Sequence, residues 1–272
     1  MDAVQAIVLG IVQGLTEFLP ISSTAHLRIV PSFFGWDDPG AAFTAVVQLG
    51  TMAAVLVYFR NELWAIASAW VRSVRARERD PQDPDARLGW YIVLGTIPIG
   101  VFGLAFKDTI ENEFRTLELI GGALILFSVV MLRAEAVSRR DRDLTSFTRR
   151  DGLIIGLAQA LALIPGVSRS GATISAGLFL NFDRTTAARY SFLLSVPAVV
   201  LSGLFELRHL GEGGGAGAGA TVLATVLAFV VGYLSIAFLL RYLVRHSIGV
   251  FAAYRLAVGA LVVVLAATNV IS

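Results

Sequence analysis

The sequence has no cysteine, and only 15% of its 272 residues are charged. The lack of cysteine excludes a disulfide framework and any thiolate metal site. The formal net charge is only +2, and the arginines stand in short runs beside apolar segments, as topology signals do. We therefore expect no nucleic-acid partner, because such a partner requires basic residues gathered on one surface.

Two further signals are missing. The glycine-rich run at 211–215 lacks the Lys-Ser/Thr ending of a phosphate-binding P-loop, so it is predicted to be a flexible connector. The N-terminus, Met1-Asp2-Ala3-Val4, has no basic region ahead of its apolar stretch. We therefore expect no cleaved signal peptide, and the first apolar stretch belongs to the working protein.

Apolar residues dominate what is present. They make up 56% of the chain, and the mean hydropathy is +0.73. This is more apolar surface than a soluble domain buries, which indicates lipid as the solvent. Six apolar windows have about the length of a helix that crosses a hydrocarbon core about 30 Å thick, which is roughly 17–25 residues. They are residues 41–59, 88–106, 117–132, 187–205, 221–240 and 248–268.

The distribution of arginine predicts the orientation of these crossings. The loops after Phe59 and after Leu132 are rich in arginine and should be cytoplasmic. The loops around 107–116 and 208–219 carry few basic residues and should lie outside. Six crossings then alternate without contradiction, and both termini are expected outside.

Two apolar stretches, 3–34 and 152–182, do not read as simple crossings, because polar and helix-breaking residues interrupt each in its middle. The interruptions are Pro20 with Ser22-Ser23-Thr24, and Pro165-Gly166 with Ser168-Arg169-Ser170-Gly171. We interpret both stretches as re-entrant helical hairpins. The chain is thus expected to be an all-α integral membrane protein, with six transmembrane helices and two re-entrant hairpins.

The two hairpins also resemble each other in sequence. Gly10, Gln13 and Leu15 lead to the first break with the spacing that Gly156, Gln159 and Leu161 show before the second. This predicts one membrane domain, residues 1–272, built from inverted repeats at about 1–133 and 150–272. The two broken tips would then meet inside the membrane, as they do in inverted repeats.

Glu17 is the first candidate functional residue. An ionisable group at membrane depth costs several kcal/mol, so Glu17 should face a polar cavity. Gln13 lies on the same helical face, four residues earlier. His26 follows beyond the break. Snorkelling of Glu17 to water, and a structural role for His26, are the less favoured alternatives.

The second set of candidates lies where a half-helix would begin at each break. Ser and Thr cap helix starts, whose free N–H groups bind phosphate. The guanidinium of Arg169 can grip phosphate oxygens in a bidentate manner and stays charged when buried. The predicted substrate-binding residues are Gln13, Ser22, Thr24, Ser168, Ser170, Gly171 and Thr173.

These residues supply what phosphoryl transfer needs, which is a nucleophile, a base and positive charge on the transferred oxygens. The predicted catalytic residues are Glu17, Ser23, His26 and Arg169. Sequence leaves open whether Ser23, His26 or a water molecule is the nucleophile, and whether Glu17 or His26 is the base. A divalent cation, Mg²⁺ or Ca²⁺, is expected on the oxygens of Glu17. Arg255, inside the last window, is expected to pair within the bundle rather than to reach substrate.

Two long motifs, 13–27 and 165–173, resemble the undecaprenyl-diphosphatase family, the bacitracin-resistance type of polyprenyl diphosphate phosphatase. Shorter matches at 47–50, 192–197 and 254–255 extend the resemblance along nearly the whole chain. The resemblance implies hydrolysis of undecaprenyl diphosphate to the monophosphate carrier of envelope polymers. The functional positions it implies are Glu17, Ser22, Ser23, His26, Ser168, Arg169 and Thr173. Many members have a second glutamate where this chain has Gln13.

The resemblance also implies a bacterial inner-membrane protein with its site facing the periplasm or exterior, dependent on a divalent cation. Its expected partners are the lipid diphosphate, membrane lipids and possible further copies of the chain. A transporter or flippase for the same carrier is the alternative, because broken helices in inverted repeats are typical of transporters. The presence of Glu17, His26 and Arg169 disfavours a passive channel. We expect Glu17 and Arg169 to line one polar cavity that opens outward.

Overall fold

The computed structural model describes residues 1–38, 40–77, 82–106, 109–110, 114, 116–206 and 217–271. Within these ranges the chain is helical and has no β-strand, only an isolated bridge between Arg142 and Phe182. The helices are α1 (Ala3–Phe18), α2 (Ser23–Phe34), α3 (Gly40–Tyr58), α4 (Arg60–Arg75), α5 (Pro84–Ala105), α7 (Leu117–Val137), α8 (Arg149–Ala160), α9 (Arg169–Phe179), α10 (Arg184–Glu206), α11 (Ala218–Leu243) and α12 (Gly249–Ala267), with 3₁₀ turns η1 (Leu144–Ser146) and η2 (Leu161–Leu163).

Four of the described helices, α5, α7, α11 and α12, are long and apolar enough to cross a membrane. A fifth candidate is the pair of α3 and α4, which is bent by 81° at its junction. The all-helical, multi-pass membrane architecture expected from the sequence is therefore confirmed. The window expected at 187–205 lies within α10, which is not among these helices.

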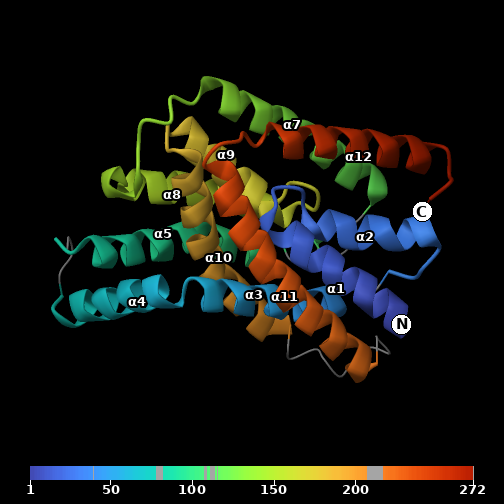
Figure 1. Ribbon diagram of the computed structural model, residues 1–272, viewed down its shortest axis with the longest axis horizontal. Coiled ribbons are helices and arrows are strands. Elements are labelled where there is room, and N and C mark those ends of the chain that lie inside the picture. The colour runs from blue at the N-terminus through green and yellow to red at the C-terminus, as the bar shows by residue number, and fades with distance from the viewer. Residues whose placement is uncertain are drawn as a thin grey trace.

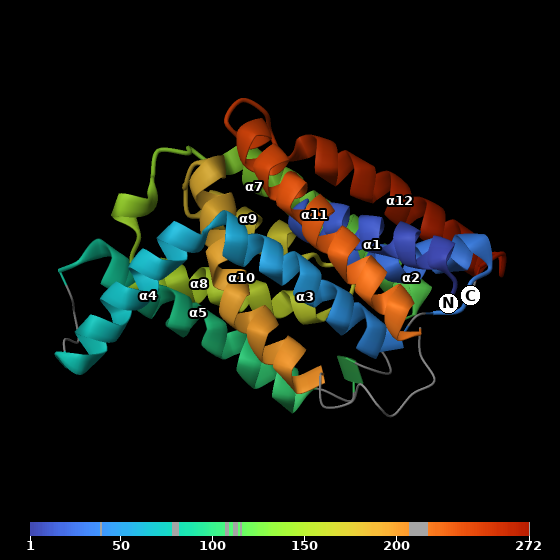
Figure 2. The ribbon, with the colours of Figure 1, turned by 60° about the horizontal axis from the view of Figure 1, so that its bottom comes forward.

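The helices form one bundle, with α4 at one end of the molecule and α2 at the other (Figures 1 and 2). α1 packs along α11, α12 along α7, and α5 against α8, while α9 and α10 lie in the middle of the bundle. The two ends of the chain lie at the same end of the molecule in both views. The core around the site includes a T-shaped contact between Phe18 and Phe192, whose rings are 5.4 Å apart. This contact joins the end of α1 to α10, next to Glu17.

Glycines let the short helices approach their neighbours closely. A Cβ at Gly10 of α1 would lie 2.5 Å from the carbonyl oxygen of Ala224 in α11. A Cβ at Gly156 of α8 would lie 2.4 Å from the carbonyl oxygen of Gly95 in α5. Such contacts are characteristic of helix pairs that pack through small residues inside membranes. The helices that lead into both breaks are thus held against long helices at backbone distance.

Each of the two interrupted stretches consists of two helices joined at the expected break. α1 ends at Phe18 and α2 begins at Ser23, while α8 continues through η2 and α9 begins at Arg169. The residues just before the second helices, Ser22 and Ser168, have φ of 76° and 70°. This left-handed backbone costs a residue with a side chain about 1–3 kcal/mol, so the surrounding structure must stabilise both turns.

Candidate functional site

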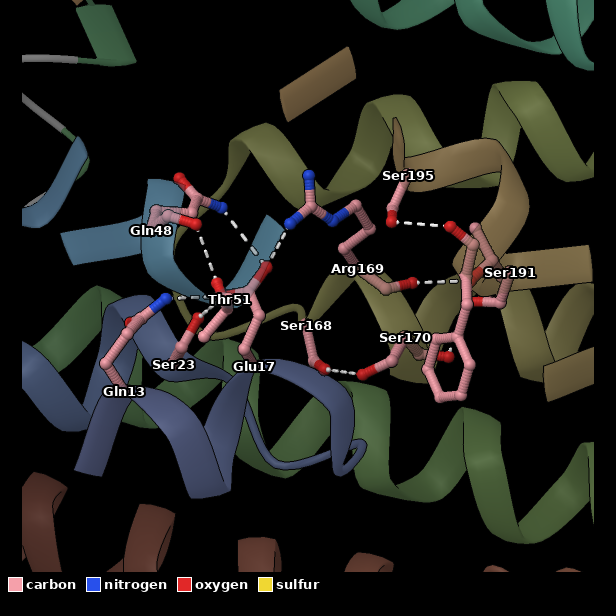
Figure 3. A network of polar contacts seen from close by, with 12 residues as sticks. Gln13, Glu17, Ser23, Gln48, Thr51, Ser168, Arg169, Ser170, Ser191 and Ser195 are labelled. Carbon is pink, nitrogen blue, oxygen red and sulfur yellow. Dashed lines mark hydrogen bonds and ion pairs between the residues drawn. The ribbon is translucent and has the colours of Figure 1, made fainter. Parts of the chain in front are cut away.

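Glu17 is the centre of a polar network, as Figure 3 shows. Its side chain is buried near the end of α1 and accepts hydrogen bonds from four side chains. Gln13 and Ser23 donate to Oε2 at 3.0 and 2.6 Å, and Gln48 donates to Oε1 at 3.1 Å. Arg169 completes the set with an ion pair to Oε1. The carboxylate is therefore paired and hydrogen-bonded, which is the condition for keeping a charge buried.

Ser23 owes its position to the break. It is the first residue of α2, directly after the strained Ser22, and this places its hydroxyl on the carboxylate of the preceding helix. A serine hydroxyl that donates a short hydrogen bond to a buried carboxylate has a base in place to take its proton. Thr24, the next residue, is exposed. The structure thus separates two neighbours that the sequence grouped together.

Arg169 begins α9, and the backbone at this start is organised by its neighbours. Ser168 caps the helix by accepting a hydrogen bond from the N–H of Gly171 at 3.1 Å. Ser170 donates to the carbonyl oxygen of Leu19 at 3.2 Å, which ties the second break to the first. The start of α9, which is the positive end of its dipole, and the guanidinium of Arg169 therefore both lie close to Glu17.

The residues along α9 and α10 extend the polar region. Thr173 donates to the carbonyl oxygen of Arg169 at 2.7 Å and lies 2.6 Å from the hydroxyl of Ser191. Two small pockets open here, and Glu17, Arg169 and Ser195 line both of them. Thr51 of α3 lines one pocket, and Ser191 of α10 lines the other. Glu17 and Arg169 thus line the same pockets, as expected, although the two residues are 152 positions apart. That the site opens outward stays a prediction.

His26 lies apart from these pockets. Its Nδ1 is 2.8 Å from the carbonyl oxygen of Ser22, and its Nε2 is 2.8 Å from the hydroxyl of Tyr254. Its ring stacks on that of Tyr254, with 5.6 Å between centroids and 11° between planes. The buried histidine therefore reaches the network through the backbone of Ser22, not through the carboxylate of Glu17.

Arg255 is wholly buried and bonds to both breaks. It donates to the carbonyl oxygens of Gly166 and Val167 at 2.8 and 3.1 Å, and to that of Pro20 at 3.3 Å. It also donates to the hydroxyl of Ser128 on α7 at 3.3 Å. The expectation that Arg255 pairs inside the bundle is confirmed, and its partners are backbone carbonyls that the broken helices leave without N–H donors.

Comparison with known proteins decides the family. Residues 6–261 match the family described as bacitracin resistance protein BacA. The chain belongs to the BacA family. It is 52% identical to an undecaprenyl-diphosphatase of Nocardioides sp. and 54% identical to one of Mycobacterium sp., in each case over 100% of this chain and 99% of the relative. An undecaprenyl-diphosphatase of Myxococcus xanthus is 51% identical over 100% of this chain and 92% of the relative.

Sequence reasoning gave no individual role to several residues of this BacA family site. Gln48 and Thr51 come from α3, while Ser191 and Ser195 come from α10. Gln48 stood in one of the shorter motifs of the resemblance, at 47–50, and Ser195 in another, at 192–197. A second signal was available for Gln48 and Thr51, since each is a polar residue inside a largely apolar helix.

The oxygen atoms around Glu17 bear on whether a divalent cation fits this BacA family site. Among the described residues, no group of three or more His, Asp or Glu side chains is placed to hold a metal ion. Gln13 nonetheless offers a buried Oε1 without a hydrogen-bond partner, and Ser23 offers its hydroxyl. Carboxylate, amide and hydroxyl oxygens are suitable ligands for Mg²⁺ or Ca²⁺. Glu17, Gln13 and Ser23 therefore fit a hard cation that takes only a few of its ligands from the protein.

Proposed function

We propose that this protein hydrolyses undecaprenyl diphosphate to undecaprenyl phosphate and inorganic phosphate in the bacterial inner membrane. The names of its relatives, at about 50% identity over their full length, support this substrate and reaction. The observation that carries the proposal is the shared carboxylate. Glu17 accepts the hydroxyl of Ser23 on one oxygen and the guanidinium of Arg169 on the other. A nucleophile, its base and a phosphate-binding cation thus meet at one point.

In the proposed mechanism, Arg169 moves from the carboxylate to the terminal phosphate of the substrate. Ser23 Oγ attacks that phosphorus, and its proton passes to Glu17. The bond between the phosphorus and the bridging oxygen breaks, and undecaprenyl phosphate leaves. The proton held by Glu17 leaves with undecaprenyl phosphate. Water then attacks the phosphoserine and gives its proton to Glu17, which passes it to Ser23 Oγ as the bond from phosphorus to Oγ breaks. Inorganic phosphate departs and Ser23 is restored.

The remaining groups stabilise the charge that develops on phosphate. The free N–H groups at the start of α9 and the guanidinium of Arg169 offer donors to the oxygens of the transferred phosphoryl group. A divalent cation held by Glu17, Gln13 and Ser23 would neutralise part of the charge of the diphosphate. Ser191 and Ser195 line the same pocket and offer hydroxyl groups to its oxygens.

The proposed topology has six crossings and two hairpins that enter from opposite leaflets, with the site facing the exterior. The alignment of the two breaks supports it, because each has a serine with left-handed φ directly before the second helix. The tethers from Ser170 to Leu19 and from Arg255 to both breaks also support it. Inverted repeats bring broken helices together in this manner.

Phosphate release from undecaprenyl diphosphate by the detergent-purified protein tests the function. Turnover without a membrane gradient is expected for an enzyme, whereas a transporter of the carrier would release no phosphate. Glu17→Ala and Ser23→Ala should each lower kcat by about 10³-fold or more, because each removes a group that acts in the bond-making step. Glu62→Ala is the matched control, since that carboxylate pairs with Arg189 and does not line either pocket. Its kcat should equal that of the wild type.

A further inference from the structure

The hydroxyl of Tyr254 and the ring of His26 form a pair that the mechanism above does not use. His26 is buried on α2, and Tyr254 is half exposed on α12. The hydrogen bonds of the ring define its protonation. A carbonyl oxygen only accepts, so the Nδ1 that faces the Ser22 carbonyl carries the proton. In the neutral ring Nε2 therefore accepts, and the hydroxyl of Tyr254 donates to it.

The carbonyl that His26 holds belongs to the strained residue of the first break. Ser22 has φ of 76° and ψ of 97°, a backbone conformation that a serine keeps only when its surroundings hold it there. Its carbonyl oxygen accepts from the backbone N–H of His26 at 3.2 Å as well as from the ring at 2.8 Å. Two donors from one residue therefore fix the peptide plane that leads directly into Ser23.

The other end of the pair is anchored just as firmly. Tyr254 directly precedes Arg255, whose buried guanidinium bonds to Pro20 of the first break and to Gly166 and Val167 of the second. This region of α12 is thus fixed relative to both breaks. The tyrosine hydroxyl is consequently a fixed donor rather than a surface group that happens to meet the ring.

We propose that His26 and Tyr254 are positioning residues that hold Ser22 in its left-handed conformation and so aim the hydroxyl of Ser23 at Glu17. Tyr254 orients the ring, the ring holds the carbonyl of Ser22, and Ser22 sets the direction of the next side chain. Proton transfer stays with Glu17, whose Oε2 is 2.6 Å from Ser23 Oγ. This inference rests on the proposed function, in which Ser23 is the nucleophile.

Kinetics of four variants of the full-length protein test the proposal. Asn places an N–H close to where His26 has Nδ1–H, so His26→Asn should keep kcat within about tenfold of the wild type, while His26→Ala should lose about 100-fold. Tyr254→Phe should lower kcat by about tenfold and leave KM unchanged. In the His26→Ala background, Tyr254→Phe should have no further effect, because it acts through the ring. Tyr233→Phe, on α11, removes a hydroxyl elsewhere and is the matched control.

The pH profile of kcat and the comparison of His26→Asn with His26→Ala distinguish a positioning role from acid–base catalysis. The acidic limb of the pH profile of kcat should be the same in the wild type, His26→Asn and Tyr254→Phe. Three results would each overturn the proposal. They are a loss of kcat in His26→Asn as large as that in His26→Ala, a shift of the acidic limb of the pH profile in a variant, and additive losses of kcat in the double variant. Wild-type kinetics in Tyr254→Phe would overturn it too.

A measurement that needs no turnover keeps this inference distinct from the proposed function. The chain has only three histidines, so solid-state NMR of protein with ¹⁵N-labelled histidine can resolve the ring of His26, with His26→Asn supplying the assignment. A neutral ring protonated at Nδ1 is the expected result, and a ring protonated only at Nε2 contradicts the proposal even if the enzyme is active. If the wild type releases no phosphate but shows the Nδ1 form, the proposed function fails while the hydrogen-bond geometry stands.

Discussion

Arg169 at the start of α9 and Glu17 near the end of α1 form an ion pair that joins the two broken hairpins. The pair places one cation and one carboxylate at the point where both helices are interrupted. In the proposed mechanism, a bound phosphate replaces Glu17 as the anionic partner of Arg169. The pair is a structural link in the free protein, and we propose that it is also the part of the site that responds to substrate.

Two substitutions of Arg169 should therefore distinguish the contribution of its charge to catalysis from that of its planar guanidinium. Arg169→Ala is expected to lower kcat/KM by about 10³-fold, because it removes the cation from the transferred phosphate. Arg169→Lys keeps the charge but loses the planar fork, and we expect an intermediate loss of about tenfold to 100-fold. Phosphate release at several substrate concentrations measures both. Equal losses in the two variants would show that charge at this position contributes nothing.

Gln48 provides a test of how the carboxylate is held. Gln48→Leu removes the donor to Glu17 Oε1 and should lower kcat by about tenfold, because the carboxylate loses part of its orientation. Gln159→Leu is the matched control. Gln159 is a wholly buried glutamine whose side-chain amide has no hydrogen-bond partner, so its replacement should leave kcat unchanged. A similar loss of kcat in both variants would argue against a specific role for Gln48.

Gln13 is one of the proposed ligands of the divalent cation, and its replacement tests that role. Gln13→Glu adds a second carboxylate beside Glu17, and we expect it to lower the Mg²⁺ or Ca²⁺ concentration needed for half-maximal activity by about tenfold or more. A chelator should stop phosphate release in the wild type, and added cation should restore it. Titration of the chelated enzyme with each cation measures the change. An unchanged midpoint would remove Gln13 from the proposed ligand set.

Arg142 joins the loop before α8 to the turn after α9. It donates to both carboxylate oxygens of Asp151 at 3.1 and 2.7 Å, to two backbone carbonyls, and lies 4.2 Å from the ring centroid of Phe182. Arg142→Ala should destabilise the protein by about 2 kcal/mol, because a buried carboxylate loses its partner. Arg139→Ala, whose exposed pair with Asp141 is worth little, is the control. Melting temperatures in detergent compare the two.

The same pair predicts how stability depends on pH. Burial by itself raises the pKa of Asp151, but the hydrogen bonds from Arg142 and Thr148 outweigh it, and the pKa lies below its usual 3.8. The stabilisation is therefore complete above this usual value and is lost as the pH falls through the lower, folded value. The wild-type melting temperature should drop in this acidic range. Arg142→Ala should show a smaller drop there, because it has already lost the pair.

Packing of α1 on α11 gives a prediction about the fold itself. Gly10→Ala should destabilise the protein by about 1–3 kcal/mol, because its Cβ would lie 2.5 Å from the carbonyl oxygen of Ala224 and would push the helices apart. Gly122→Ala, in α7, meets no atom within 4 Å and should be neutral or stabilising, since alanine favours helix over glycine. Thermal unfolding in detergent distinguishes them. Equal effects would mean that α1 is not held by close contact.

The sequence by itself determined the helical membrane class, the position of both breaks and the family. These follow from local properties, namely long apolar runs, proline and serine inside them, and ordered motifs. It also indicated Glu17 and Arg169, because an ionisable group in an apolar run needs a partner. That reasoning identifies single residues but not the pairs that they form.

Only the tertiary structure decided which partners meet. Ser23 bonds to Glu17 while its neighbour Thr24 is exposed, because the left-handed turn at Ser22 determines which side chain faces α1. Gln48 reaches the same carboxylate from another helix, and His26 is directed to Tyr254, which lies 228 residues further along the chain. Such contacts depend on how distant helices pack, and packing is set by the shapes of all the surfaces together rather than by any one segment.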